Sequence, residues 1–283
     1  MEASFQASSP VTAPAVTGDD QPLLSLRGIS KNFGAVQALS GVNLDIPTSQ
    51  VTALIGDNGA GKSTLIKTIA GIWGPSVGDI FWNGEHVTIK TPREADELGV
   101  ATVYQDLALC DNLDIVGNMF LGHELLRHRL LDENKMETSA KDTLAGLSVT
   151  TVKSVRQLVE SLSGGQRQSV AVARAVMRDA KLVIMDEPTA ALGVSQTAQV
   201  LGLIRRLADR GIAVLVISHN LNDVFSIADR LAVMHLGRMV HSGPISEYTP
   251  QSAVEIITTG KFGGDNSNSR ANQGQKSRET TND

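Results

Sequence analysis

Residues 51–72 constrain this chain most, because an apolar run, a glycine-rich loop and a helical pattern follow one another directly. Residues 51–55 have the composition of a buried strand, and residues 64–72 carry apolar side chains at helical spacing. The loop between them reads GDNGAGKST and fits the pattern G-x-x-x-x-G-K-[ST]. A strand that enters a helix through such a loop predicts the phosphate-binding corner of an α/β fold.

The loop has the chemistry that a triphosphate requires. Glycines let the backbone curl so that several N–H groups point at one anion, and the helix N-terminus adds partial positive charge. Lys62 can reach the β- and γ-phosphates of ATP, and the Ser63 hydroxyl can ligate Mg²⁺. The alternative, a plain glycine-rich turn, is disfavoured by the flanking strand and helix. The predicted nucleotide-binding residues are Gly56, Asp57, Asn58, Gly59, Ala60, Gly61, Lys62, Ser63 and Thr64.

A second apolar run, residues 182–185, ends in Asp186 and Glu187. A strand buried on both faces has no use for acids, but α/β sheets bind ligands at the carboxyl ends of their strands. We expect Asp186 to hold Mg²⁺, directly or through water, and Glu187 to orient and polarise the attacking water. Two solvated acids at a strand end are the alternative, and the phosphate loop makes it the poorer one.

The string LSGGQ at residues 162–166 predicts a helix N-terminus, with Ser163, Gly164, Gly165 and Gln166 at its start. Such an end is another anion site. A chain with one phosphate loop has no obvious need of a second, so the simplest use is to close on the γ-phosphate held by another copy. An ordinary serine-capped helix is the alternative.

Strands alternate with helices through residues 166–242, which predicts a parallel sheet covered on both faces. Asn83-Gly84 predicts a tight hairpin within residues 80–87. The stretch 106–162, with paired leucines at 125/126 and 130/131, is expected to be a mainly helical insert. The folded part is expected to be residues 23–260, between polar, disordered segments 1–22 and 261–283.

Composition excludes several classes of protein. The net charge of −5 offers no basic field for a nucleic-acid backbone, so no nucleic-acid partner is expected. No apolar run approaches the ~20 residues of a membrane-spanning helix, so any action at a membrane needs another chain. The single cysteine, Cys110, rules out an intrachain disulfide.

In this order and spacing the three motifs resemble those of the ATP-binding cassette (ABC) family, and the resemblance covers residues 23–242. Within it, Gln105 looks like the family's glutamine, which contacts Mg²⁺ or water and senses the membrane partner. His219 looks like the switch histidine near the γ-phosphate, so the implied catalytic residues are Glu187, His219 and Gln105. Phe33 stands where the family places an aromatic ring against adenine.

The resemblance implies a P-loop ATPase of two lobes, with an antiparallel β subdomain and a helical insert. Two copies would sandwich two ATP molecules head to tail, each site joining the loop of one copy to residues 163–165 of the other. One position departs from the family pattern: the usual aspartate after the acidic pair is Gly193. The resemblance therefore implies that a carboxylate contact across the dimer is lost.

Two further segments, residues 112–124 and 186–197, resemble bacterial monosaccharide importers of the ribose, xylose and fructose type. The single cassette resembles the fructose type and predicts a homodimer. The resemblance implies a separate integral membrane permease, a periplasmic or extracellular sugar-binding protein that acts through it, and a peripheral place at the cytoplasmic face of the cell membrane.

Two other functions fit the sequence less well. The first is a soluble ABC ATPase acting on ribosomes or DNA, but such proteins carry two cassettes or a long coiled coil. The insert of about 57 residues shows no sustained heptads. The second is a regulatory cassette that binds ATP without hydrolysing it, and the presence of Glu187 speaks against that.

Overall fold

A six-stranded sheet positions the segments in which the sequence predicts phosphate-binding, metal-binding and catalytic residues. In the computed structural model, which describes residues 21–261, its strand order is β12-β11-β3-β10-β9-β6. All neighbours pair in parallel except β12, which is antiparallel to β11. The strands are β3 (Val51–Gly56), β6 (Val100–Val103), β9 (Leu182–Asp186), β10 (Ala213–Ile217), β11 (Arg230–His235) and β12 (Arg238–Pro244).

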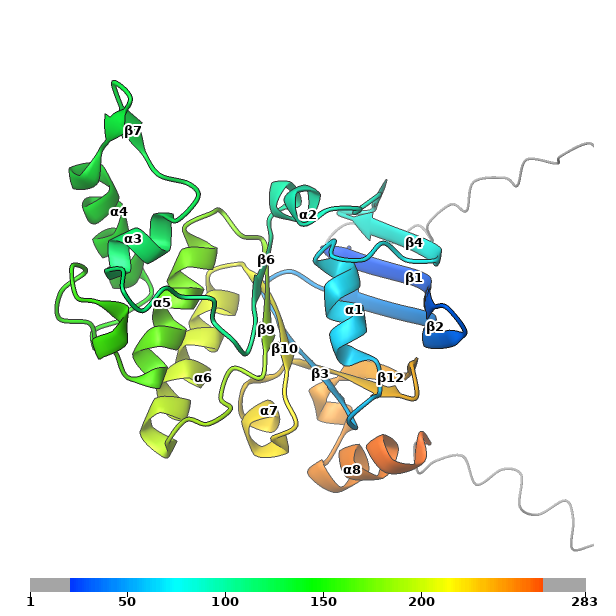
Figure 1. Cartoon of the computed structure of the whole chain (residues 1–283). Helices are drawn as coiled ribbons and strands as arrows, with labels where there is room; N and C mark the ends of the chain where they lie inside the picture. Colours follow the sequence, from blue (N-terminus) through cyan, green and yellow to red (C-terminus); the bar gives the residue numbers. More distant parts are fainter. Residues whose placement is uncertain (1–20, 262–283) are drawn as a thin grey trace, which may run out of the picture.

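A second, antiparallel sheet has the order β2-β1-β4-β5 (Figure 1). Asn83 and Gly84 adopt positive φ values of 50° and 78° between β4 and β5, which confirms the predicted tight hairpin. Its strands are β1 (Leu24–Phe33), β2 (Val36–Ile46), β4 (Val77–Trp82) and β5 (Glu85–Val87). Together the two sheets confirm an α/β P-loop core with an antiparallel β subdomain.

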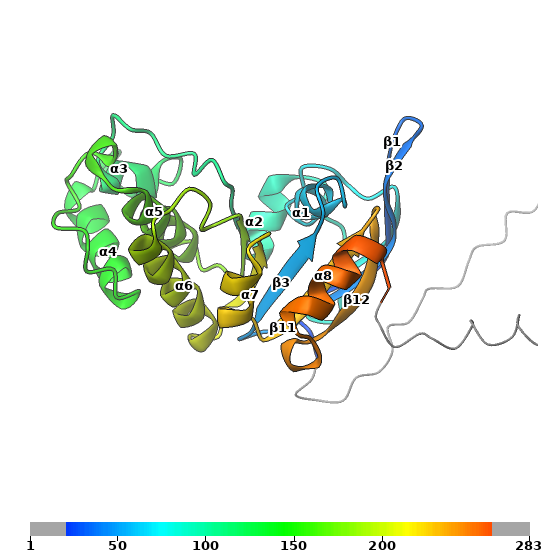
Figure 2. The ribbon, with the colours of Figure 1, turned by 90° about the horizontal axis from the view of Figure 1, so that it is seen from below.

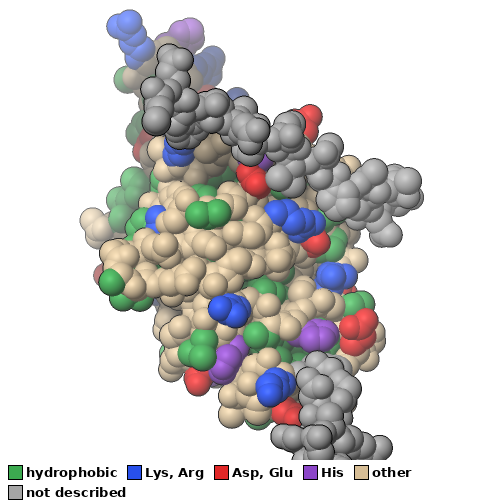
Figure 3. All heavy atoms as spheres, turned by 90° about the vertical axis from the view of Figure 1, so that its right-hand side faces the viewer, with side chains coloured by type: hydrophobic (Ala, Val, Ile, Leu, Met, Phe, Trp, Pro, Cys, Tyr) green, Lys and Arg blue, Asp and Glu red, His purple; other side chains and the backbone are tan. Residues whose placement is uncertain are grey.

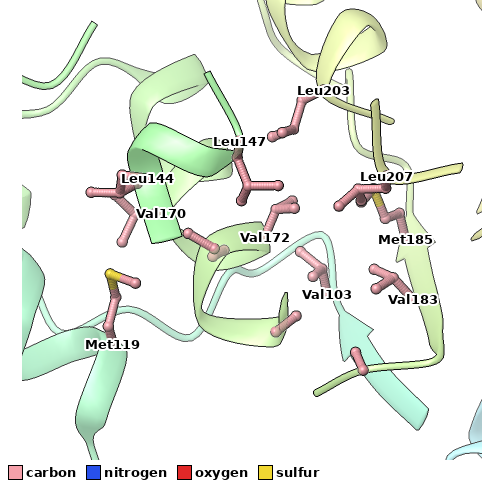
Figure 4. Close-up of a cluster of buried hydrophobic side chains, with 14 of the residues drawn as sticks. Val103, Met119, Leu144, Leu147, Val170, Val172, Val183, Met185, Leu203 and Leu207 are labelled. Carbon is pink, nitrogen blue, oxygen red and sulfur yellow. The ribbon is translucent and has the colours of Figure 1, made fainter. Parts of the chain in front are cut away.

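Helix α1 (Lys62–Ile69) packs in the core shared by the two sheets, where it buries Leu65, Ile66 and Ile69. The opposite face of the six-stranded sheet is covered by α5 (Gly164–Val176) and α6 (Val194–Asp209). Figure 4 shows that core, with Val183 and Met185 of β9 facing Leu207. Ile184 packs into the core on the other face, so β9 is buried on both sides and apolar from Leu182 to Met185.

Helices at two places were not expected. α2 (Pro92–Leu98) is opened by Thr91 through a capping box with Glu94. α8 (Pro250–Thr259) packs with α7 (Leu221–Ile227) against β3 and β11, and Figure 2 shows α8 beside β11 and β12.

The segment 106–162 differs from the expected mainly helical insert. Its only α-helices are α3 (Ile115–Phe120) and α4 (Glu133–Gly146), and a short 3-10 helix spans Val159–Ser161. Three of the four paired leucines lie in a hairpin of β7 (Leu126–Arg127) and β8 (Leu130–Leu131). The reason is local: the two residues at its tip adopt positive φ, which a tight hairpin turn needs and a helix forbids. Apart from Gln21, Pro22 and Lys261, the segments expected to be disordered lie outside the described residues. No helix within residues 21–261 has both the length and the apolar character needed to cross a membrane.

Candidate functional site

Four neighbouring parallel strands end at one cavity of about 660 Å³. Across the sheet, β3 leads into the glycine-rich loop, β10 into His219, β9 into Asp186 and Glu187, and β6 toward Gln105. The carboxyl ends of parallel strands lie at one edge of a sheet, so residues up to about 160 positions apart in the chain become neighbours. All of these residues except Gly56 and Asp57 line the cavity.

The glycine-rich loop curls because its glycines take conformations closed to other residues. Gly59 and Gly61 have φ values of 80° and 99°. A Cβ atom at Gly61 would lie 2.9 Å from the carbonyl oxygen of Ala38, whereas one at Gly59 would meet nothing within 4 Å. Gly61 also precedes α1 without a side-chain cap, which leaves the N-terminus of α1 open to an anion. Residues 58–64 line the cavity.

Lys62 folds back over the loop. Its ammonium donates hydrogen bonds to the carbonyl oxygens of Gly56, at 2.7 Å, and Asp57, at 3.0 Å. Burial lowers the pKa of Lys62, while the charges of Glu187, Asp57 and Asp186 act in the opposite direction. The Lys62 ammonium therefore lies among carboxylates and carbonyl oxygens. Phosphate oxygens could take the place of its two carbonyl contacts. Ser63, the next residue, is exposed in the same cavity.

Asp186 and Glu187 share the end of β9 but have different surroundings. Burial, and then the charge of Glu187, raises the pKa of Asp186 above its ordinary value. Glu187 has a φ of 50°, and its N–H donates to the carbonyl oxygen of Ile217 at 2.9 Å. Its Oε2 atom lies 2.8 Å from Nδ1 of His219. The Glu187 side chain is 17% exposed and that of His219 76%, so the pair reaches from the sheet edge toward solvent.

The protein oxygen atoms at the cavity suit Mg²⁺ only when substrate phosphates supply further ligands. Ser63, Gln105 and Asp186 bring a hydroxyl, an amide and a carboxylate oxygen to the cavity. Residues 21–261 contain no group of three or more His, Cys, Asp or Glu side chains that could hold a metal by themselves. Mg²⁺ is commonly bound by one or two carboxylates with substrate phosphates, so these residues fit that ion.

Several lining residues were not foreseen from the sequence. Val36, Gln37 and Ala38 come from β2, and Leu236 and Gly237 from the turn between β11 and β12. The Gly237 N–H donates to the carbonyl oxygen of Ala60 at 3.0 Å, which fixes this turn against the glycine-rich loop. These residues are small, apolar or uncharged, so no motif signals them. Only the Leu-Gly dipeptide between two strands hints at the turn.

The LSGGQ segment lies outside the cavity, as an exposed helix end. Ser163 caps α5: its Oγ accepts from the N–H of Gln166 at 3.4 Å, and its own N–H donates to Oε1 of Gln166 at 2.8 Å. A Cβ atom on Gly164 would lie 2.8 Å from Cδ2 of Leu192. Gly165, behind it, is buried against Gln196 of α6. No residue from 163 to 166 lines the cavity of its own chain.

Phe33 also lies outside the cavity lining. It ends β1, pairs with Val36 of β2, and stacks edge-to-face on Trp73 with ring centroids 4.8 Å apart. Its side chain is partly open, with the residue 41% exposed. Since Val36 does line the cavity, the ring borders the site, and its contact with adenine stays a prediction.

Comparison with known proteins agrees with this geometry. The model of the ABC transporter family matches residues 39–190. The chain is 44% identical to the fructose import ATP-binding protein FrcA of Rhizobium meliloti, over 85% of this chain and 95% of that protein. It is also 44% identical to the xylose/arabinose import ATP-binding protein XylG of Sulfolobus acidocaldarius, over 85% and 96%. A nucleotide-free ATP-binding cassette of an ABC transporter superposes with a TM-score of 0.73 at 28% identity, covering 83% of this chain and 98% of that one. The chain therefore belongs to the ABC transporter family and is one of its ATPase cassettes.

Proposed function

We propose that this chain binds and hydrolyses ATP to drive the import of a monosaccharide through a separate membrane permease. The observation that carries the proposal is the single cavity into which Lys62, Asp186, the Glu187–His219 pair and Gln105 converge. The sugar class comes from the relatives, which are named as fructose and xylose/arabinose import proteins.

Each residue then has a role at the triphosphate. The N–H groups of Gly59 and residues 61–64 and the Lys62 ammonium hold the β- and γ-phosphates. Ser63, Gln105 and Asp186 would hold Mg²⁺, which when bound offsets the phosphate charge. Glu187 orients a water molecule for attack on the γ-phosphorus, and His219 fixes the Glu187 carboxylate while facing the same phosphate.

The exposed end of α5 supports a head-to-tail pair of copies. Residues 163–166 are ordered by a capping box yet lie outside the cavity of their own chain. A helix N-terminus ready for an anion can serve the nucleotide of a second copy without rearrangement. Gly193 leaves the segment between Glu187 and α6 without the usual carboxylate, so we expect the two sites to communicate less tightly.

A second hollow, of about 940 Å³, supports docking of the permease between the lobes. We call it the interlobe groove; it is lined by α2, β6, His123 and the α5 residues Arg174 and Arg178. Tyr104 also lines it, and the next residue, Gln105, lines the nucleotide cavity. A protein bound in the groove would therefore contact Tyr104, the residue next to Gln105 of the ATP site. Docking there places the chain at the cytoplasmic face of the membrane, where the sugar-binding protein reaches it only through the permease.

Lys62→Ala tests the nucleotide site directly. Calorimetric titration with Mg·ATP is expected to show no binding, because the variant loses the cation that faces the phosphates. Lys90→Ala, which removes an exposed lysine before α2, is the matched control and should titrate like the wild type. Unchanged affinity in Lys62→Ala would refute the proposed site.

Two further measurements test the assembly. Glu187→Gln with Mg·ATP is expected to elute from a sizing column as a dimer, because ATP remains bound and is not hydrolysed. A stably monomeric ATP-bound variant would contradict the head-to-tail pair. Deletion of the gene is expected to abolish uptake of a monosaccharide, and an adjacent permease should co-purify with the wild-type chain.

A further inference from the structure

The β7–β8 hairpin leaves three leucines in water. Leu126, Leu130 and Leu131 are 65%, 75% and 55% exposed. Leu126 pairs with Leu131 and Arg127 with Leu130, so each face of the two-stranded hairpin carries leucine. Leu125, just before β7, packs against the core between α3, α4 and α5 and anchors the base. Clustered exposed apolar side chains on an ordered element mark a contact surface.

The hairpin tip is basic in a chain of net charge −5. Arg127, His128 and Arg129 stand together there, and all three are exposed. Among the ion pairs of residues 21–261 none involves Arg127 or Arg129. Figure 3 shows Lys or Arg and His side chains gathered at the upper end of the molecule, the end where Figure 1 places the hairpin.

The acidic residues at the base of the hairpin have partners of their own. The Asp132 side chain accepts from the N–H of Lys135 as the N-cap of α4, and Glu133 pairs with Arg156 at 3.2 Å. The N–H of Gly122 donates to Glu124 at 3.0 Å, which lowers the pKa of Glu124. None of these carboxylates forms an ion pair with Arg127 or Arg129, so both guanidinium groups remain available to an anionic partner.

The hairpin is connected to the interlobe groove along the chain. His123 lines that groove, and β7 begins three residues later. Figure 1 shows the hairpin and α2 on the same side of the molecule. A permease seated in the groove would bring that side, with its leucines and basic tip, toward the cytoplasmic surface of the membrane.

We propose that the β7–β8 hairpin binds the anionic phospholipid surface beside the permease, with its arginines on the headgroups and its leucines at the boundary of the acyl chains. This orientation rests on the proposed function. Leucine flanked by arginine suits a membrane interface, where apolar side chains enter and cations contact anionic headgroups. A permease loop is the poorer partner of the tip, because the cytoplasmic loops of membrane proteins are enriched in Lys and Arg. The interlobe groove differs, since Asp96 and Glu97 line it beside its arginines, whereas residues 127–129 include no acid.

A fluorophore at the tip tests the contact in the full-length chain. His128→Cys in a Cys110→Ser background is labelled with an environment-sensitive dye and titrated with phosphatidylcholine vesicles, with or without 30% phosphatidylglycerol. We expect a blue shift and a rise in emission with the anionic vesicles only, reversed by 0.5 M salt. The titration needs neither ATP nor permease, so its failure would leave the proposed ATPase function untouched.

Two sets of variants decide the outcome. Arg127→Glu with Arg129→Glu is expected to weaken vesicle binding at least about tenfold, since each arginine near an anionic surface contributes about fivefold. Arg238→Glu with Lys261→Glu makes the same charge change on exposed residues near β12 and α8, away from the hairpin, and should bind as before. Changing Leu126, Leu130 and Leu131 to Ser is expected to remove the blue shift.

The arginine variants keep the test valid if the leucine variants fail to fold, because both arginines are exposed and unpaired. The proposal is overturned if emission does not change with anionic vesicles, or if both vesicle types act alike and the arginine variants bind normally. It is also overturned if the leucine variants lose only co-purification with the permease while wild-type chain ignores vesicles, since the hairpin would then be a protein contact.

Discussion

The Nδ1 atom of His219 lies 2.8 Å from the Oε2 atom of Glu187, joining the ends of two neighbouring strands above the nucleotide cavity. Glu187 is largely enclosed and His219 is largely exposed. The histidine can therefore exchange its contact with the carboxylate for one with a phosphate, while the carboxylate keeps its place. This pairing predicts that the two residues act as one unit in hydrolysis.

Substituting both residues tests that unit. Glu187→Gln is expected to lower kcat for ATP hydrolysis by about 10²–10⁴-fold, as for the loss of a general base. His219→Ala should also lower kcat, and the double variant should be little slower than Glu187→Gln alone, because residues that act together are not additive. Phosphate release at saturating Mg·ATP gives the three values, with Glu255→Gln on α8 as the control. Losses that multiply would show that the pair is not a unit.

Two glycines of the loop should differ in their tolerance of a methyl group. Both have positive φ, so alanine costs about 1–2 kcal/mol of strain at either. At Gly61 the Cβ atom also meets the carbonyl oxygen of Ala38 at 2.9 Å, and overpacking adds about 1–3 kcal/mol.

Gly61→Ala is therefore expected to lose more stability than Gly59→Ala, and to lose nucleotide binding with it. Urea unfolding of the two variants, followed by Mg·ATP titration, compares them under identical conditions. Equal losses would mean that β2 yields to the added methyl group.

Asp186→Asn should stabilise the fold at neutral pH and abolish hydrolysis. Burial raises the pKa of Asp186 above the 3.8 of the unfolded chain, so the native state binds the proton more tightly. The stability from this group is complete below pH 3.8 and is lost as the pH rises through the native pKa, where the buried charge becomes a cost.

Replacing that carboxylate by an amide removes the cost. We expect a higher Tm for Asp186→Asn at pH 7 in the absence of nucleotide and Mg²⁺, and a smaller difference near pH 4. Thermal melts at the two pH values measure it. A lower Tm at pH 7 would mean that attraction to Lys62 outweighs burial, since Lys62 acts in the opposite direction.

Gly193→Asp should stabilise α6. Gly193 is the N-cap of this helix, makes no side-chain cap, and no acidic residue follows in the first turn. A Cβ atom there meets nothing within 4 Å, and the φ of −73° suits any residue. An aspartate would cap the helix, and its negative charge would interact favourably with the positive end of the helix dipole, contributing about 0.5–1 kcal/mol. Thermal melts should show Tm higher by about 1–4 °C. No change would mean that the new side chain stays in water.

The sequence indicated the motif residues of the candidate site better than it indicated the other residues that line the cavity. The glycine-rich loop, the acid pair and the serine-led helix each carry a local pattern, because phosphate binding and helix capping are set by a few adjacent residues. Val36, Ala38 and Gly237 carry none, since they reach the cavity only through the packing of β2 and the β11–β12 turn against the loop.

The segment 106–162 shows that a local pattern can also fit two different structures. Leucine pairs separated by three residues fit both a helix and a hairpin, and short apolar runs do not distinguish them. The positive φ values at His128 and Arg129 settle the hairpin, and no residue type there demands them. The sequence alone determined which segments carry a phosphate-binding pattern, because such a pattern resides in contiguous residues. Only the tertiary structure decided that Glu187 meets His219 and that the leucines stay in water, because these depend on strand order and on contacts between distant segments.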